Sequence, residues 1–176
     1  MNLKKSDHLF FHPLFACLLF ITLTAIDQFT KIMAIEKLKN KPPFEILKGI
    51  FEFQYCENDG IAFGLFSGKI SIFLIFSLVF LVIAAIIYKK IPKTPKYFPL
   101  TLVLIVMASG AVGNFIDRLT REYVVDFIYF RLIDFPIFNI ADIYVVCGCI
   151  AMIFLLLVKY QDEDFAFMTL KQKDKP

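Results

Sequence analysis

FPIFNIADIYVVCGCIAMIFLLLV, residues 135–158, decides the fold, because this long apolar run contains a single charged residue, Asp142. A helix needs about 20 mostly apolar residues to cross the hydrocarbon core of a bilayer. Near the start of the run, Asn139-Ile140-Ala141-Asp142 has the pattern of a capping box, with Asn139 as the cap and Asp142 at the third helical position. The stretch therefore predicts a membrane-spanning helix with one carboxyl group in its first turn.

Three further runs contain no Asp, Glu, Lys or Arg and have similar lengths, at residues 9–26, 70–88 and 97–116. The chain is 59% hydrophobic, which is too apolar for one soluble core to hide. Four spans fill roughly half of the chain and leave too little for a separate soluble domain of usual size. We therefore predict a membrane protein of the all-α class with four transmembrane helices.

Short strands are expected outside the membrane. Phe, Ile and Tyr interleave with Glu, Lys and Gln in residues 44–55, and residues 123–130 indicate another short strand or an interfacial segment. The charged tail is expected to be frayed. We expect one membrane domain, residues 1–176, with spans at about 9–31, 69–88, 97–117 and 138–159, an outer loop at 118–134 and a cytoplasmic tail at 160–176.

Lysines without acidic neighbours mark one loop, since Lys89, Lys90, Lys93 and Lys96 lie between the second and third runs. Short cytoplasmic loops are enriched in Lys and Arg, so we expect this loop and both termini in the cytoplasm. The net charge of +3 is small and does not indicate a nucleic-acid partner. We expect the basic residues to contact membrane lipid headgroups instead.

This topology brings the unusual polar residues to the outer face of the membrane. An ionisable residue at membrane depth is costly, so it indicates a functional site. Residues three or four apart share a helical face, which groups Asp27 with Lys31, Asn114 with Asp117 and Arg118, and Asn139 with Asp142. The residues that converge are Asp27, Lys31, Asn58, Asp59, Gly60, Asn114, Asp117, Arg118, Asp126, Asn139 and Asp142.

Each of these groups also has a purely structural explanation. Asp27 and Lys31 could form an interfacial ion pair, and the polar cluster that ends the third helix could orient outer loops. Asp142 could serve only as a capping carboxylate, and Asp126 could be a solvated acid. Their convergence at one face favours a site over these separate explanations.

The residue types at this face restrict the chemistry. A Ser–His pair needs a nearby histidine, but His8 and His12 lie at the opposite end, so Ser109 lacks a base. There is no HExxH zinc motif, and Cys56 has no histidine partner. Two carboxylates remain, and in a poorly solvated pocket they would share a proton. One would take a proton from water while the other donates to a peptide carbonyl, without a metal or a covalent intermediate.

Five motifs resemble those of lipoprotein signal peptidase, the bacterial membrane enzyme also called signal peptidase II. DQFTK at residues 27–31 is similar to the family's DxxTK, and NDGIAFG at residues 58–64 is similar to NxGxAFG. SGAVGNFIDR at 109–118 is similar to GGAxGNxxDR, and FPIFNIAD at 135–142 is similar to FPxFNxAD. Residues 124–128 have the same sequence as the family's VVDFI motif. The motifs occur in the family's order and cover most of the chain.

The resemblance implies an aspartic endopeptidase in the bacterial cytoplasmic (inner) membrane, with its active site near the extracytoplasmic face. It implies that Asp126 and Asp142 are catalytic, that no cofactor is needed, and that residues 44–66 form a small β-like outer segment. Its substrate would be a prolipoprotein with diacylglycerol on a cysteine, cleaved just before that cysteine, and we expect a monomer. The implied supporting or substrate-binding residues are Asp27, Lys31, Asn58, Gly60, Asn114, Asp117, Arg118, Asn139 and Ala141.

Two other classes of function stay open at this point. The protein could be a non-enzymatic membrane subunit or a small transporter whose outer acids bind a cation. It could also be a lipid-headgroup enzyme that holds Mg²⁺ with Asp117, Asp126 and Asp142, although the chain lacks a glycine-rich phosphate loop. The chain also departs from the family pattern where Ser109 replaces Gly and Ile61 replaces a smaller residue.

Overall fold

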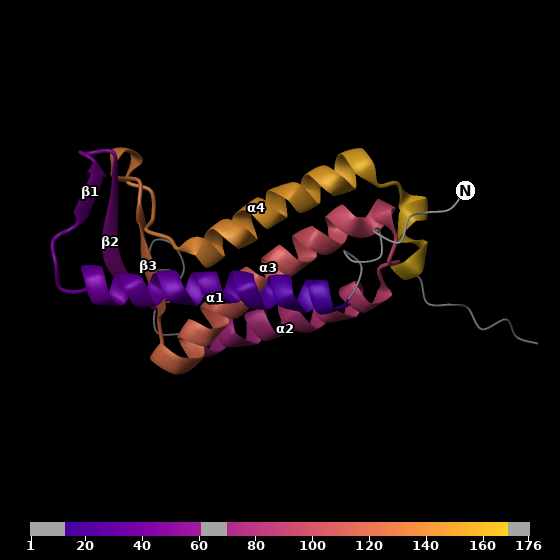
Figure 1. Ribbon diagram of the computed structural model, residues 1–176, viewed down its shortest axis with the longest axis horizontal. Helices are drawn as coiled ribbons and strands as arrows, with labels where there is room; N and C mark the ends of the chain where they lie inside the picture. The colour runs from indigo at the N-terminus through magenta and orange to yellow at the C-terminus, as the bar shows by residue number, and fades with distance from the viewer. Residues whose placement is uncertain (1–12, 61–69, 169–176) are drawn as a thin grey trace, which may run out of the picture.

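Four long helices with a small sheet at one end make up the computed structural model, which describes residues 13–60 and 70–168 (Figure 1). All four helices are long and apolar enough to cross a membrane. They are α1 (Pro13–Leu38), α2 (Ile70–Lys90), α3 (Phe98–Arg121) after the turn η3 (Pro95–Tyr97), and α4 (Ile140–Phe154), which the π-helical turn η5 (Leu155–Lys159) continues. The predicted four-helix membrane fold with a small β segment is confirmed.

Two helices extend past the ends expected for their membrane spans. α1 continues to Leu38 because its last turns pack on the sheet, where Ala34 is buried against Val125 and Phe127. α3 continues to Arg121 and stops at Glu122, whose backbone is left-handed with φ of 66°. Residues 9–12 of the first expected span, residue 69 of the second and residues 61–66 of the β-like segment lie outside the described residues, as does His8.

α3 lies at the centre of the bundle and packs against α1, α2 and α4. Two glycines allow this close approach. A Cβ added at Gly110 would come within 2.5 Å of the Ala141 carbonyl oxygen on α4. A Cβ added at Gly113 would overlap the Asp27 carboxylate on α1. The small residues of α3 therefore set how closely α1 and α4 approach each other around it.

The sheet joins two regions that are far apart in the sequence. It is antiparallel and has the order β1 (Phe44–Leu47), β2 (Phe51–Asn58), β3 (Val124–Tyr129). β3 lies between α3 and α4 in the chain and is followed by the turn η4 (Arg131–Ile133). Asp126 is opposite Cys56 on β2, and Ile128 forms a bridge with Phe138, the residue before Asn139. The sheet thus brings Asp126, the end of β2 and the start of α4 together.

The start of the C-terminal tail is packed and not frayed as expected. Residues Asp162–Met168 form the short helix η6. The ring of Tyr97 stacks on Tyr160 at a centroid distance of 5.7 Å, and the Tyr97 hydroxyl donates to the Asp164 carbonyl oxygen at 2.8 Å. Lys96 also pairs with the Asp164 carboxylate. Aromatic packing therefore orders the tail at least to Met168.

Candidate active site

Asp126 lies in the middle of β3 with only 1% of its surface exposed. One carboxylate oxygen accepts a hydrogen bond from Asn139 Nδ2 at 2.6 Å, and the other accepts one from Asn58 Nδ2 at 2.8 Å. These donors come from α4 and β2, which the register of the sheet brings to either side of Asp126. A buried carboxylate with a donor on each oxygen is held in one orientation.

Asp142 lies in the first turn of α4 and is half-buried. The predicted capping box is confirmed, because Asn139 Oδ1 accepts from the Asp142 backbone N–H at 3.0 Å and Asp142 Oδ2 accepts from the Asn139 N–H at 3.1 Å. Its other oxygen, Oδ1, accepts from Asn114 Nδ2 at 2.8 Å. Asp142 is therefore both a capping group and part of the polar cluster around Asp126.

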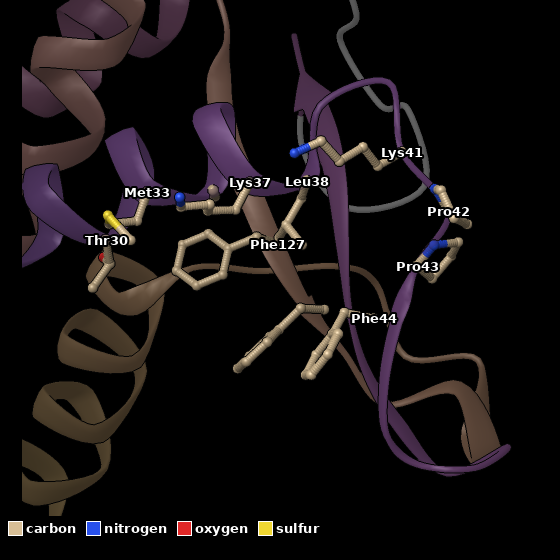
Figure 2. Close-up of a pocket in the computed structure, with 11 residues that line it drawn as sticks. Thr30, Met33, Lys37, Leu38, Lys41, Pro42, Pro43, Phe44 and Phe127 are labelled. Atoms are coloured by element: carbon tan, nitrogen blue, oxygen red, sulfur yellow. The ribbon is translucent and has the colours of Figure 1, made fainter.

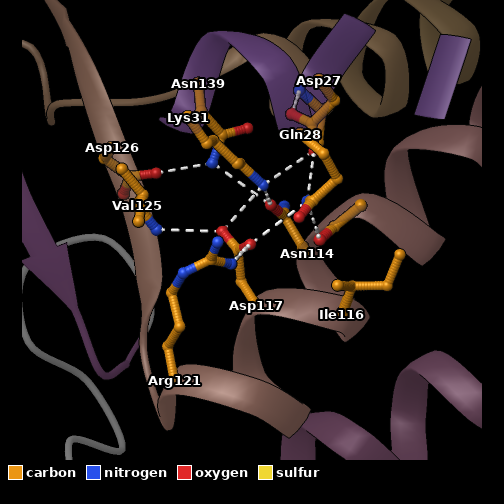
Figure 3. A network of polar contacts seen from close by, with 12 residues as sticks. Asp27, Gln28, Lys31, Asn114, Ile116, Asp117, Arg121, Val125, Asp126 and Asn139 are labelled. Atoms are coloured by element: carbon orange, nitrogen blue, oxygen red, sulfur yellow. Dashed lines mark hydrogen bonds and ion pairs between the residues drawn. The ribbon is translucent and has the colours of Figure 1, made fainter. Parts of the chain in front are cut away.

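Lys31 is fully buried at the centre of a polar network between α1 and α3 (Figure 3). Its ammonium nitrogen lies 3.0 Å from Asp27 Oδ2 and 3.0 Å from Asp117 Oδ2, and it donates to Asn114 Oδ1 at 2.8 Å. Asp27 uses its other oxygen to accept from the Ala141 backbone N–H of α4 at 3.0 Å. The network therefore ties α1, α3 and the first turn of α4 to one another.

Asp117 is fully buried, and both of its carboxylate oxygens accept hydrogen bonds or pair with cations. None of its partners is one of the asparagines that bond to Asp126. Arg121 pairs with Asp117 at 2.6 Å, Gln28 Nε2 donates at 3.1 Å, and the Val125 N–H donates at 3.1 Å, as Figure 3 shows. It does not line the cavity that Asp126 and Asp142 share. Its contacts indicate that it holds the end of α3 against the start of β3.

The orientations of the three asparagine amides follow from their neighbours. Lys31 can only donate, so the oxygen of Asn114 faces Lys31 and its NH₂ faces Asp142. The same reasoning applies to the other two, because each amide oxygen accepts from a backbone N–H. Asn139 Oδ1 accepts from residue 142 and Asn58 Oδ1 from residue 60, which turns both NH₂ groups toward Asp126. The amides are thus fixed as donors to the two carboxylates.

Asp126 and Asp142 line one cavity of about 710 Å³ at the sheet end of the bundle. Arg118 also lines it, with its guanidinium carbon 4.9 Å from the centre of the Phe73 ring. The cavity is polar at one side and apolar where α2 and α4 form its walls. Its other lining residues are Asn58, Gly60, Phe73, Phe76, Phe135, Pro136, Ile137, Phe138, Ile143, Val146 and Cys147.

The environment of Asp126 changes its acidity. Burial, followed by the negative charge of Asp142, raises the pKa of Asp126 to about 7 from its ordinary value of 3.8. The hydrogen bonds from Asn58 and Asn139 act in the opposite direction because they stabilise the charged form. Asp126 can therefore hold a proton near neutral pH while lying next to a second carboxyl group.

The sequence-predicted residues fall into two groups in the structure. Asp126, Asp142, Asn58, Gly60 and Arg118 line the cavity. Those that lie behind it and connect to the carboxylates or to α4 are Asp27, Lys31, Asn114, Asp117, Asn139 and Ala141. The structure thus brings the predicted residues together at one end of the bundle.

Three members of the network were missed by the sequence reasoning. Gln28 donates to Asp27, Asp117 and the Gly113 carbonyl oxygen, and Arg121 pairs with Asp117. Gly113 provides the space for the Asp27 carboxylate. Two signals were available in the sequence: Gly113 occupies a fixed glycine position of the GGAxGNxxDR motif, and Arg121 follows Asp117 by four residues.

All four carboxylate oxygens of Asp126 and Asp142 are hydrogen-bonded. Each oxygen accepts one N–H group, which fixes the orientation of both carboxylates. Within residues 13–60 and 70–168, no group of three or more His, Cys, Asp or Glu side chains is arranged to hold a metal ion. Ser109 bonds to the Ile105 carbonyl oxygen at 2.8 Å, which gives it a structural role inside α3.

Comparisons with known proteins show which family the chain belongs to. A family model described as signal peptidase (SPase) II matches residues 19–158. The lipoprotein signal peptidase of Clostridium tetani is 42% identical over 143 residues, covering 79% of this chain and 90% of the relative. That of Clostridium acetobutylicum is 38% identical over 142 residues, covering 79% and 91%. A solved structure described as a bacterial membrane enzyme has a TM-score of 0.69 and 29% identity, covering 89% of this chain and 93% of that one. The chain therefore belongs to the signal peptidase II family.

Proposed function

We propose that this protein is an aspartic endopeptidase that removes signal peptides from diacylglyceryl-modified prolipoproteins by cleaving before the lipid-modified cysteine. The observation that carries the proposal is the pairing of a buried Asp126 with Asp142 over one cavity. Membership of the signal peptidase II family supports the peptidase activity and the lipoprotein substrate class. The two relatives named above are both lipoprotein signal peptidases.

The reaction uses the two carboxyl groups in different protonation states. Asp126, with its pKa raised to about 7, carries the shared proton and donates a hydrogen bond to the scissile carbonyl oxygen. Asp142 is the more exposed of the two and takes a proton from the attacking water. As water adds, Asp126 gives its proton to the carbonyl oxygen, which produces a neutral gem-diol intermediate. The C–N bond then breaks as the proton on Asp142 passes to the leaving amine, and one gem-diol hydroxyl returns its proton to Asp126, so both aspartates are back in their starting states.

The surrounding amides keep the two carboxyl groups in place during this cycle. Asn139 bridges the pair, since its side chain bonds to Asp126 and caps the helix that carries Asp142. Asn114 Nδ2 donates to Asp142 Oδ1, and Lys31 fixes the orientation of the Asn114 amide. We assign positioning roles to these three residues and to Asp27, which holds the first turn of α4.

The cavity walls fit a substrate that is partly lipid. Phe73 and Phe76 of α2 and Ile143 and Val146 of α4 all line the cavity, so its apolar surface suits acyl chains and an apolar signal-peptide helix. Arg118 lies at the same cavity and provides a donor for a peptide carbonyl or an ester oxygen. Gly60 also lines the cavity, and its backbone N–H donates to Asn58 Oδ1 at 3.0 Å.

We further propose the bacterial cytoplasmic membrane as the location, with both termini in the cytoplasm and the active site near the extracytoplasmic face. The lysine-rich loop between α2 and α3 supports this orientation. Membrane lipids surround a monomer in this arrangement, and neither a metal nor another cofactor takes part in the reaction. A protease-protection assay on vesicles with tags at both termini tests the orientation.

The test of the proposed activity is cleavage of a purified diacylglyceryl-modified prolipoprotein in detergent. Asp126→Asn and Asp142→Asn each lose at least about a thousandfold in kcat, since either change removes one half of the acid–base pair. The matched control is Asp134→Asn, because Asp134 lies between β3 and α4 but accepts from the Tyr129 hydroxyl and not from the asparagines. Near-normal turnover by either dyad variant refutes the assignment. Loss of wild-type activity in EDTA would instead support the Mg²⁺ enzyme.

A further inference from the structure

A second cavity, of about 660 Å³, lies between the last turns of α1 and the sheet (Figure 2). We call it the α1–sheet groove, and it shares no lining residue with the active-site cavity. Neighbouring residues of β3 point into the two spaces, Asp126 into the active site and Phe127 into the groove. The groove is lined by Thr30, Met33, Ala34, Lys37, Leu38, Lys41, Pro42, Pro43, Phe44, Phe53 and Phe127.

The floor of the groove is aromatic and aliphatic. The rings of Phe53 and Phe127 lie 6.2 Å apart between centroids, and Phe44 is directly opposite Phe53 in the sheet register. Figure 2 shows the rings of Phe44 and Phe127 beneath the end of α1, with Met33 on the side of Phe127 that is away from Phe44. Phe44 keeps 62% of its surface exposed although it is a large apolar residue. This exposed apolar surface needs a cover of matching chemistry.

The rim of the groove is positively charged. Lys37 and Lys41 are the only charged residues among those described that line it. Both are exposed, and Lys41 Nζ bonds to the backbone carbonyl oxygen of Glu36 at 3.3 Å, which keeps it close to α1. Two ammonium groups beside an apolar floor are complementary to an anionic group attached to a hydrocarbon chain.

The groove also lies where α1 passes from apolar to charged surface. Phe29, Ile32 and Met33 are exposed by 63%, 45% and 37%, which suits side chains that face hydrocarbon. Lys37 follows Met33 by about 6 Å along the helix at 1.5 Å per residue, and one headgroup layer has a similar depth. The apolar end of the groove is therefore continuous with the hydrocarbon core, and its lysines lie at headgroup level.

We propose that the α1–sheet groove is a binding site for an anionic phospholipid, with the phosphate between Lys37 and Lys41 and one acyl chain against Phe44, Phe53 and Phe127. A zwitterionic lipid lacks the net negative charge that the rim complements. The lipid would bridge α1 to β1 and β2, on the opposite side of β3 from the active site. It is distinct from the prolipoprotein substrate, whose cavity lies between α2 and α4.

Native mass spectrometry of the full-length protein in a neutral detergent tests this site. The protein is titrated with dioleoylphosphatidylglycerol, dioleoylphosphatidylcholine or water-soluble glycerol 3-phosphate. The wild type binds the phosphatidylglycerol in preference to the other two. Lys37→Gln/Lys41→Gln weakens that binding about 30-fold, about fivefold for each lysine. The control Lys48→Gln removes the same charge in the turn between β1 and β2, outside the groove, and leaves binding unchanged.

The wild-type titrations are decisive even if a variant folds poorly. Equal binding of the two phospholipids overturns the proposal, because the lysines then select nothing. Glycerol 3-phosphate that binds as tightly as the lipid also overturns it, because the apolar floor then contributes nothing. A double variant that binds phosphatidylglycerol as tightly as the wild type also overturns the proposal. The groove would then have to bind something else, such as a polypeptide or a second copy of this chain.

Discussion

Replacing Lys31 by Met removes the central charge of the buried network while keeping most of the aliphatic stem. Lys31 is fully buried and contacts Asp27 and Asp117 at 3.0 Å each and Asn114 at 2.8 Å. Breaking a buried ion pair by deleting one partner costs about 3–5 kcal/mol, mainly because the remaining charge is left uncompensated. Here two carboxylates lose a shared partner, so we expect a loss of about 4 kcal/mol in the free energy of unfolding.

A second substitution tests the physical cause of that loss. Asp27→Asn removes one of the stranded negative charges and keeps an oxygen that can accept the Ala141 N–H. The double variant Lys31→Met/Asp27→Asn should therefore recover about 1–3 kcal/mol relative to Lys31→Met alone. The recovery is expected in stability and not in cleavage, because Asn114 loses the donor that orients it toward Asp142.

Denaturant unfolding of the detergent-purified protein measures both effects, with Lys39→Met as the matched control. Lys39 pairs with Glu57 at 2.8 Å on the surface, where its side chain is 40% exposed, and such pairs contribute at most about 1 kcal/mol. The reasoning is refuted if Lys31→Met is no more destabilising than Lys39→Met. It is also refuted if the double variant loses as much free energy of unfolding as the two single variants lose together.

Three further predictions concern packing, pH dependence and the choice of aspartate. Gly110→Ala displaces the start of α4, so it should lower kcat at least about tenfold in the cleavage assay, whereas Gly148→Ala meets only a flexible Met side chain and should retain activity. Asn58→Leu removes a hydrogen bond that lowers the pKa of Asp126, so the fall in kcat/KM above pH 7 should move to higher pH in a pH–rate profile. Asp117→Asn should lower the unfolding midpoint but leave kcat of the folded protein within about tenfold of wild type, and complete inactivity of stably folded protein would contradict its structural role.

The helices and the capping box could be predicted because their signals are local. The backbone N–H and C=O groups of a membrane-spanning run of about 20 apolar residues must bond to each other within one helix. Asn139 and Asp142 are close enough in sequence to cap such a helix. The strands were also predictable from alternating residues. The register between β2 and β3 could not be predicted, because β3 comes from a distant region of the chain. The pairing of Cys56 with Asp126 depends on how the helices hold the two strands.

The composition of the candidate site was predictable, but its internal connections were not. Helical spacing alone grouped Asp117 with Asn114 and Arg118, whereas the structure turns Asp117 toward Gln28 and Arg121, away from the cavity. Cross-helix contacts of this kind depend on how closely α1 and α3 approach, and sequence spacing does not report that distance. The catalytic and supporting roles assigned to the site residues stay predictions until activity is measured.

The central claim, that Asp126 and Asp142 share a proton, is tested most directly by infrared difference spectroscopy of the carboxyl C=O band during a pH titration. We predict a protonated carboxyl that titrates near pH 7 in the wild type and is missing from Asp126→Asn. In Asp142→Asn the same band should titrate at lower pH, because the negative charge that raises the pKa of Asp126 is gone. A wild-type protein without a carboxyl band that titrates near neutral pH, or a band that Asp142→Asn leaves unmoved, would contradict the proposed dyad.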